Sequence, residues 1–470
     1  MKRYLRTSKK MISTKDFQQS SFSVIAMLSS GASILIIYKL VVSSLGLESL
    51  GIFSLALSLA VMIKLLDITG SSYCARFIAE ENSEAAETIC RKAIIIDTAM
   101  LITICFYFVV GSISIIFAPT LLHIFYAGVL AEQLERLVPL MIVLLSMNAL
   151  METHYASLDG LHKTVTRSVV SIVGNLVCIV LAIWLVPKFG IVGAVFAQIS
   201  QALVSILLCR VVLVRAISDL GFFPWHFSLF DFNALLKFGS SIHVSTLSGF
   251  GFDPLMKILV VHFGGPILLA YYDLSLKTVG LARSAFSAAF IPIYNNFSAF
   301  KASDLDINYR YFENISRLNS FLVGLAFSSL AIITPLISLV FLESLDFTFI
   351  SLACGILIGY AGNALCMPMY LYAQSKKRLF WNNCGQLTIA CVSLLVCFLI
   401  GLYDRDSVVY SIPIGLLIGS FFGYLGNRKD FVNEYIRVKE FHLNETRFIR
   451  AILSVVLTAV IILGINFSLV

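Results

Sequence analysis

The stretch Ala93-Ile-Ile-Ile-Asp-Thr-Ala-Met-Leu-Ile-Thr-Ile-Cys-Phe-Tyr-Phe-Val-Val-Gly-Ser-Ile-Ser-Ile-Ile-Phe117 decides the fold class of this chain. It is longer than the ~20 residues that a helix needs to cross the ~30 Å hydrocarbon core of a bilayer. Asp97 is its only charged residue. This pattern predicts a membrane-spanning helix.

The rest of the chain repeats the pattern. It has 470 residues, of which 59% are hydrophobic and 13% charged, and its mean hydropathy is +0.91. A soluble chain needs roughly 25% charged residues to cover its surface. We therefore predict an all-α polytopic membrane protein without a soluble domain. Thirteen apolar stretches are predicted spans: 20–43, 47–69, 93–117, 136–158, 167–187, 190–214, 234–262, 266–291, 316–342, 347–372, 379–402, 406–426 and 447–468.

The lysines and arginines set the orientation of these spans. When successive spans alternate in direction, 28 of the 34 Lys and Arg residues fall toward one side, and Arg136, Lys188 and Arg405 fall on the other. Basic loops stay in the cytoplasm. We therefore predict a cytoplasmic N-terminus. The three remaining lysines, Lys39, Lys64 and Lys257, lie inside predicted spans. A charged residue in such a position is a candidate functional residue.

Several classes of function are disfavoured. The sequence contains no Walker loop and no nucleophile beside a base, and its outer connections are short. The ten cysteines lack the spacing of a metal site, so we interpret them as packing residues. The first span has no small-residue cleavage site and is predicted to be retained. We expect no enzymatic activity, no cofactor, no metal and no nucleic-acid partner.

The chain resembles itself when it is shifted by about half its length. Leu50–Leu59 and Leu269–Leu276 both open a span after a short outer turn, with a shift of 219. Tyr155 and Tyr370 both lie seven residues before a basic pair, with a shift of 215. Chance likeness between apolar segments is the alternative. Six spans per half is an even number, so both halves point the same way, as in many secondary transporters.

The repeat predicts the organisation of the chain. The parts are a basic cytoplasmic N-terminus (1–19), a first six-helix lobe (20–214), a cytoplasmic linker (215–233), a second six-helix lobe (234–426), a cytoplasmic loop (427–446) and an extra C-terminal span (447–470).

The repeat also relates the charges inside the spans. Lys39 corresponds within one residue to Lys257, and Lys64 corresponds to Arg283. If the halves face each other across a cleft, these residues form an outer and an inner basic pair. For Lys39 and Lys64 the alternative is that each side chain extends to the nearest headgroups.

The seventh and eighth spans carry the most charge. Asp253 and Lys257 are four residues apart, as are Asp273 and Lys277, so each pair can meet on one helix face. Glycines and Pro254 beside Asp253 predict an interruption of the seventh span. A hydrated cleft would satisfy all four charges; the alternative is that ion pairs only fix packing.

Four further polar residues lie near inner helix ends: Asp67, Asp97, Glu152 and His154. They are candidate proton or cation sites, or side chains satisfied by their neighbours. In the twelfth span, glycines recur at every fourth position from Gly415 to Gly423, which predicts a close-packing face.

Three segments resemble a known family. They are Gly46–Glu80, the Gly-x-x-Gly-Ala turn in Leu185–Ala194, and Asp253–Leu276 with its Gly-rich turn and Tyr pair. Over roughly residues 15–426 the chain resembles polysaccharide-biosynthesis flippases, of the O-antigen type, in the multidrug/oligosaccharidyl-lipid/polysaccharide exporter superfamily. It departs from them in the turn between spans eleven and twelve and in its extra C-terminal span.

The resemblance implies a V-shaped pair of lobes that works by alternating access. It implies a cargo of an undecaprenyl-pyrophosphate-linked oligosaccharide, moved to the outer leaflet of a bacterial inner membrane in lipopolysaccharide biosynthesis, with ion coupling. Implied partners are this lipid-linked oligosaccharide, membrane lipids and the polysaccharide polymerase machinery. Candidate diphosphate-binding cations are Lys39, Lys64, Lys257, Lys277 and Arg283, and candidate coupling or pairing acids are Asp67, Asp253 and Asp273.

Rival functions remain. A drug/cation antiporter of the same superfamily needs an anionic pocket, which the two acids of spans seven and eight could supply. A lipid II flippase would share the basic cleft. A secondary transporter for a small anion is the alternative from another class, and a membrane polymerase is a weaker one.

Overall fold

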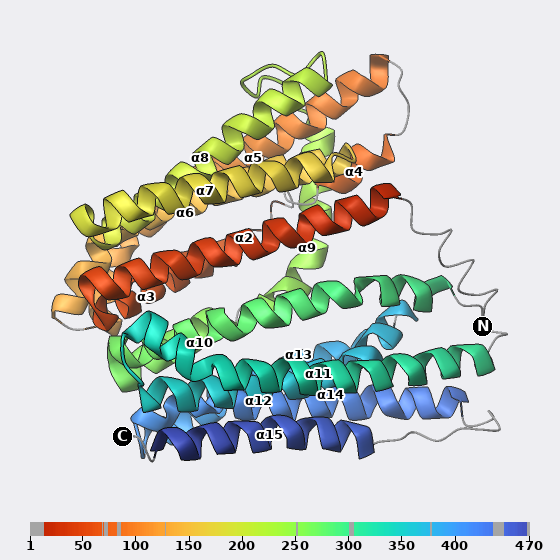
Figure 1. Ribbon diagram of the computed structural model, residues 1–470. Helices are drawn as coiled ribbons and strands as arrows, with labels where there is room; N and C mark the ends of the chain where they lie inside the picture. The colour runs from red at the N-terminus through yellow and green to blue at the C-terminus, as the bar shows by residue number, and fades with distance from the viewer. Residues whose placement is uncertain are drawn as a thin grey trace. The chain divides into compact units, whose positions relative to one another are not determined.

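The computed structural model describes residues 14–67, 69, 74–81, 86–126, 128–250, 252–299, 305–376, 378–435 and 446–467. These residues form helices joined by short connections, and no strand occurs among them (Figure 1). The α-helices are α2 (Thr14–Leu45), α3 (Leu47–Lys64), α4 (Cys74–Glu80), α5 (Ala86–Phe125), α6 (Val129–Gly160), α7 (Thr164–Phe189), α8 (Ile191–Ala216), α9 (Leu229–Phe250), α10 (Phe252–Ala299), α11 (Leu305–Leu342), α12 (Phe347–Ser375), α13 (Phe380–Gly401), α14 (Ser411–Tyr435) and α15 (Thr446–Phe467), with a short 3₁₀ helix, η2 (Asp406–Tyr410), before α14.

Twelve stretches of the described residues are long and apolar enough to cross a membrane. The predicted all-α, multi-pass class is therefore confirmed. Thirteen spans were predicted, and the difference arises where the predicted spans 234–262 and 266–291 meet. That region is divided between α9, which ends at Phe250, and α10, which begins at Phe252. α10 also contains the kink at Gly265, so the single stretch Phe252–Ser284 includes the end of the first of these predicted spans and the beginning of the second.

The chain divides into two compact units. Unit 1 comprises the described residues of Met1–Ser44 and Ala56–Thr246, and unit 2 those of Leu45–Leu55 and Leu247–Val470. In unit 1, α6 packs against α4, α5, α7 and α8. In unit 2, α12 packs against α10, α11, α14 and α15, and 72% of its span is buried. α12 is thus the central helix of unit 2.

The glycine face predicted in the twelfth span is a close-packing face, as expected. α13 and α14 are packed side by side. A Cβ on Gly415 would lie 2.9 Å from the Ile389 carbonyl oxygen, and one on Gly423 would lie 3.0 Å from the Trp381 carbonyl oxygen. Both distances are too short for a side chain, so α14 approaches the backbone of α13 only because these positions are glycines.

The Gly-x-x-Gly-Ala segment between α7 and α8 also has a structural explanation. Gly190 has φ 63° and ψ −139°, a conformation that residues with a Cβ avoid. It reverses the chain in a single residue. A Cβ on Gly193 would lie 3.0 Å from the Val186 nitrogen, so the first turn of α8 lies directly against the end of α7.

The sidedness of the connections can be tested by thiol labelling. In a cysteine-free background, we expect single cysteines at Lys188 and Asp404 to react with a membrane-impermeant reagent added to intact cells. We expect cysteines at Lys163 and Lys376 to react only after the cells are permeabilised, because basic connections stay inside. Labelling of the second pair in intact cells would reverse the predicted orientation.

Candidate functional site

α10 reverses direction at Gly265, which has φ 76° and ψ −179°. Lys257 lies eight residues before this glycine and Asp273 eight residues after it, and Lys257 Nζ is 2.7 Å from Asp273 Oδ1. In a straight helix, sixteen residues would separate the two Cα atoms by about 24 Å. Side chains cannot bridge that distance. The two halves of α10 therefore run antiparallel, with both residues about 12 Å from the turn.

Lys257 binds two carboxylates. Its Nζ is also 3.2 Å from Asp253 Oδ2, so the predicted Asp253–Lys257 pair is confirmed. Asp273 binds Lys257, whereas within the described part of the chain Lys277 forms no ion pair. Lys257 is 4% exposed and Asp273 1%, while the Asp253 side chain is 48% exposed. With all three groups ionised, this triad of Asp253, Lys257 and Asp273 has a formal charge of −1.

This geometry changes the interpretation of Lys257. A buried ammonium held by two carboxylates is not a free cation for a phosphate. Two carboxylates and one ammonium at matched depth fix the two halves of α10 against each other. The triad therefore favours the alternative stated for these residues, that their ion pairs fix packing.

Arg283 has a different environment. Its side chain is exposed, and its guanidinium carbon lies 5.0 Å from the centroid of the Tyr360 ring on α12. Among the residues that the structure describes, no carboxylate forms an ion pair with it. Arg283 lies about 27 Å along the helix from Gly265, and Lys277 about 18 Å. In unit 2, positive charge without an ion pair among the described residues is thus found on the second half of α10, which follows Gly265.

In unit 1, the predicted charges have polar partners. Lys64, the last residue of α3, forms a 2.5 Å ion pair with Glu152 of α6, and both side chains are about 40% exposed. Asp67 accepts hydrogen bonds from the Thr69 backbone and hydroxyl at one oxygen and from the Tyr107 hydroxyl at the other. Asp67 therefore links Thr69 to Tyr107 of α5.

The remaining polar candidates near inner helix ends also contact neighbours, although the buried Nε2 of His154 has no hydrogen-bond partner among the described residues. The buried His154 ring donates from Nδ1 to the Leu150 carbonyl, 2.7 Å away. Asp97 is fully buried and bound to Arg210. The structure therefore favours the alternative interpretation of these residues, which assigns them no separate cation site.

The turn glycines agree with the predicted repeat. Gly46, between α2 and α3, has φ 85°, and Gly265 has φ 76°; their separation is the predicted 219 residues. Lys39 is half-buried seven residues before Gly46. The equivalent of Asp273 is Ser54, which is fully buried, so unit 2 carries an acid where the first half does not. Lys39 and Lys257 belong to different units, and their pairing across a cleft stays a prediction.

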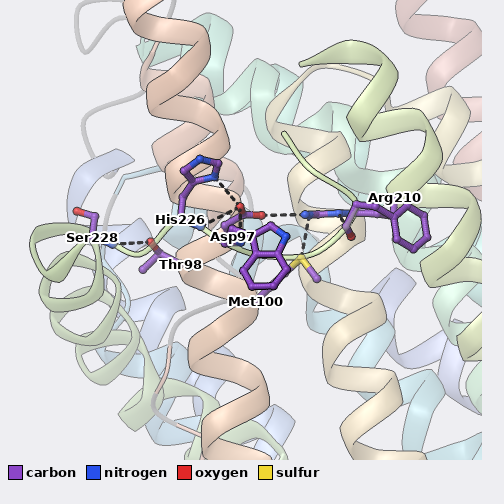
Figure 2. Close-up of polar contacts among 8 residues, drawn as sticks. Asp97, Thr98, Met100, Arg210, His226 and Ser228 are labelled. Atoms are coloured by element: carbon purple, nitrogen blue, oxygen red, sulfur yellow. Dashed lines mark hydrogen bonds and ion pairs between the residues drawn. The ribbon is translucent and has the colours of Figure 1, made fainter. Parts of the chain in front are cut away.

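A buried cluster around Asp97 and Arg210 holds the linker to unit 1 (Figure 2). Arg210 Nη2 of α8 lies 2.9 Å from Asp97 Oδ1 of α5, and Arg210 Nε donates to the Phe222 carbonyl at 3.0 Å. The other Asp97 oxygen accepts from the backbone N–H groups of Trp225 and His226 and lies 2.9 Å from His226 Nδ1. We name this group the linker clasp.

Sequence reasoning did not find the linker clasp as a unit. Asp97 was singled out as an acid near an inner helix end, but its partner Arg210 lies more than a hundred residues away on α8. The available signal was one acid and one arginine inside the inner ends of two apolar helices. Two such charges are tolerated at that depth only when they form an ion pair with each other, because an unpaired charge inside a span is energetically costly.

Similarity to solved structures identifies the fold. A multidrug resistance MATE family transporter of the MOP superfamily matches with a TM-score of 0.71 and 14% sequence identity over 88% of this chain and 99% of that one. The lipid II flippase MurJ matches with a TM-score of 0.68 and 15% identity over 95% and 98%. The fold is that of the MOP-superfamily transporters.

This fold agrees with the predicted all-α polytopic class. A MOP superfamily transporter from Pyrococcus furiosus is similar over 89% of this chain, with a TM-score of 0.55 and 14% identity. The names of these three neighbours describe two transporters and a flippase. No family model and no curated protein matches the sequence.

Proposed function

We propose that this protein is a flippase that moves an undecaprenyl-pyrophosphate-linked oligosaccharide, such as an O-antigen repeat unit, from the inner to the outer leaflet of the bacterial inner membrane. The observation that carries the proposal is Arg283. It is an exposed guanidinium on a MOP-superfamily fold, it stacks on Tyr360, and no carboxylate among the described residues neutralises it.

The chemistry of Arg283 suits a diphosphate. A planar guanidinium forms bidentate, charge-assisted hydrogen bonds to phosphate oxygens. The ring of Tyr360 holds the guanidinium by a cation–π contact. Lys277, which has no ion pair among the described residues, would add positive charge on the same half of α10.

The proposed transport cycle is alternating access between two lobes, 20–214 and 234–426, with the N-terminus in the cytoplasm. The name of one structural neighbour, a lipid II flippase, supports a cargo that carries a sugar on a lipid diphosphate. Lys39 and Lys64 from the first lobe would complete the basic cleft, and Lys64 would have to exchange Glu152 for the cargo. Lipid II itself is the alternative cargo, because it presents the same diphosphate.

A second candidate function is a drug/cation antiporter. The observation that favours it is the triad, which has a formal charge of −1 and in which the Asp253 side chain is half-exposed. An organic cation could compete with Lys257 for Asp253. Binding of a quaternary ammonium probe that is lost in Asp253→Asn and kept in Arg283→Gln would support this function over the first.

Deletion in the native host tests the proposal. We expect loss of one surface polysaccharide and accumulation of undecaprenyl-pyrophosphate-linked units that remain accessible from the cytoplasmic side. Plasmid-borne wild-type protein should restore the glycan. A normal surface glycan in a deletion strain that lacks a second flippase gene would contradict the proposal, and altered drug sensitivity alone would favour the antiporter.

A further inference from the structure

The linker between α8 and α9 exposes a dense group of large apolar side chains. Within Phe222–Phe230, six such side chains are exposed, from 48% for Phe222 to 78% for Trp225. The six are Phe222, Phe223, Trp225, Phe227, Leu229 and Phe230. A contiguous apolar surface of this kind marks an interaction site.

The segment is held in place by buried polar contacts. The linker clasp fixes Phe222, Trp225 and His226 to Asp97 and Arg210 through hydrogen bonds (Figure 2). Further along, the Ser228 N–H donates to the Thr98 hydroxyl at 3.1 Å. Because these bonds hold the backbone, the aromatic side chains point outward at fixed positions instead of collapsing against the protein.

The position of Asp97 along α5 gives the depth of the segment. The span of α5 is 37 residues, Ile89–Phe125, so it is about 55 Å long. Centred on a ~30 Å hydrocarbon core, it extends about 12 Å beyond the core at each end. Asp97 lies eight residues, or about 12 Å, from the cytoplasmic end. The linker clasp is therefore at the boundary between hydrocarbon and headgroups.

The surroundings of the segment match a lipid surface on both sides. Toward the membrane, exposed Leu207 and Val211 of α8 continue the apolar surface into the span. Exposed Arg215 and Lys237 flank the segment in the sequence, and Arg91 lies over the Phe230 ring at 5.4 Å while it forms ion pairs with Asp231 and Glu81. Basic residues at this level attract the anionic headgroups of the inner leaflet, and Trp and Phe side chains are suited to the interface.

We propose that Phe222–Phe230 is a membrane anchor that lies in the headgroup region of the inner leaflet, and that the buried Asp97–Arg210 pair holds it at that depth. The partner is the lipid of the same membrane, in contact with aromatic rings below and basic side chains above. The anchor fixes the linker to unit 1 up to the start of α9. It does not depend on the identity of the cargo.

Tryptophan fluorescence tests the proposal with the linker clasp intact. The chain has three tryptophans, so Trp184→Phe with Trp381→Phe leaves Trp225 as the only reporter. In lipid nanodiscs we expect blue-shifted emission, strong quenching by phospholipid brominated near the top of its acyl chains, and weak quenching by aqueous acrylamide. The reverse ranking of the two quenchers would overturn the proposal and favour a protein partner. Quenching by neither would overturn it as well, because Trp225 would then be covered by the protein itself.

A pair of aspartate variants tests the role of Asp97. In the single-tryptophan background, Asp97→Asn should shift Trp225 toward acrylamide quenching and red-shifted emission. Asp159→Asn, which breaks the half-exposed Asp159–Arg167 pair elsewhere in unit 1, should leave Trp225 unchanged. Equal spectra for a monodisperse Asp97→Asn protein and for Asp159→Asn would show that the pair does not set the depth. If Asp97→Asn does not fold, the quencher ranking in the intact protein still decides whether the anchor exists.

Discussion

Lys257→Gln is expected to lower the thermal stability of the protein strongly. The substitution removes the ammonium that binds both Asp253 and Asp273, and Asp273 is 1% exposed, so a carboxylate in the interior of unit 2 loses this ion pair. Removal of one partner of a buried ion pair costs about 3–5 kcal/mol. The midpoint of thermal unfolding of purified protein, measured in detergent by scanning fluorimetry, should fall accordingly.

Two variants serve as controls for this result. Lys277→Gln removes a lysine from the same helix that has no ion pair among the described residues, and it should leave the unfolding midpoint close to that of the wild type. The double variant Lys257→Gln, Asp273→Asn removes both charges of the buried Lys257–Asp273 ion pair and should recover part of the lost stability. A Lys257→Gln protein as stable as the wild type would show that the triad does not hold the two halves of α10 together.

Arg283→Gln is expected to abolish most transport without loss of stability. Arg283 is exposed and has no carboxylate partner in the described part of the chain, so its removal leaves no buried charge. One charge-assisted hydrogen bond to a diphosphate contributes about 1.5–3 kcal/mol, which corresponds to a roughly tenfold to hundredfold lower rate when cargo capture limits transport. Surface glycan in the complemented deletion strain, normalised to the amount of protein in the membrane, measures the effect.

The neighbouring substitutions separate charge from packing. Arg283→Lys keeps the charge but loses the planar fork, so it should retain more activity than Arg283→Gln and less than the wild type. Tyr360→Phe keeps the ring under the guanidinium and should be close to the wild type, whereas Tyr360→Leu should be impaired. Full activity of Arg283→Gln at normal protein levels would contradict the proposed contact with the cargo.

The membrane class and most of the helices could be predicted from the sequence because they depend on local composition. In an apolar run long enough to cross the bilayer core, the backbone N–H and C=O groups must form their hydrogen bonds within the same helix, whatever the neighbouring helices are. The seventh span was predicted over 234–262 with an interruption beside Asp253, because glycines and a proline are local signals as well. α9 ends at Phe250 and α10 begins at Phe252, next to that position.

The charged residues were harder to interpret because their partners come from other segments. The spacing of Asp253 and Lys257 reveals a contact on one helix, and the structure contains it. The bond between Lys257 and Asp273 depends instead on the residue at which the chain reverses. Asp97 and Arg210 meet only through the packing of α5 and α8 against the linker. Helical periodicity carries no information about such contacts.

The most direct test of the central claim is a reconstituted flipping assay. Purified protein in vesicles, supplied with a fluorescent oligosaccharide on undecaprenyl pyrophosphate, should expose the oligosaccharide on the opposite leaflet faster than protein-free vesicles do. Vesicles with Arg283→Gln at the same protein density should fall to about one tenth of the wild-type rate or less. Equal rates for wild-type and protein-free vesicles would contradict the claim that this protein is a flippase for a lipid-linked diphosphate.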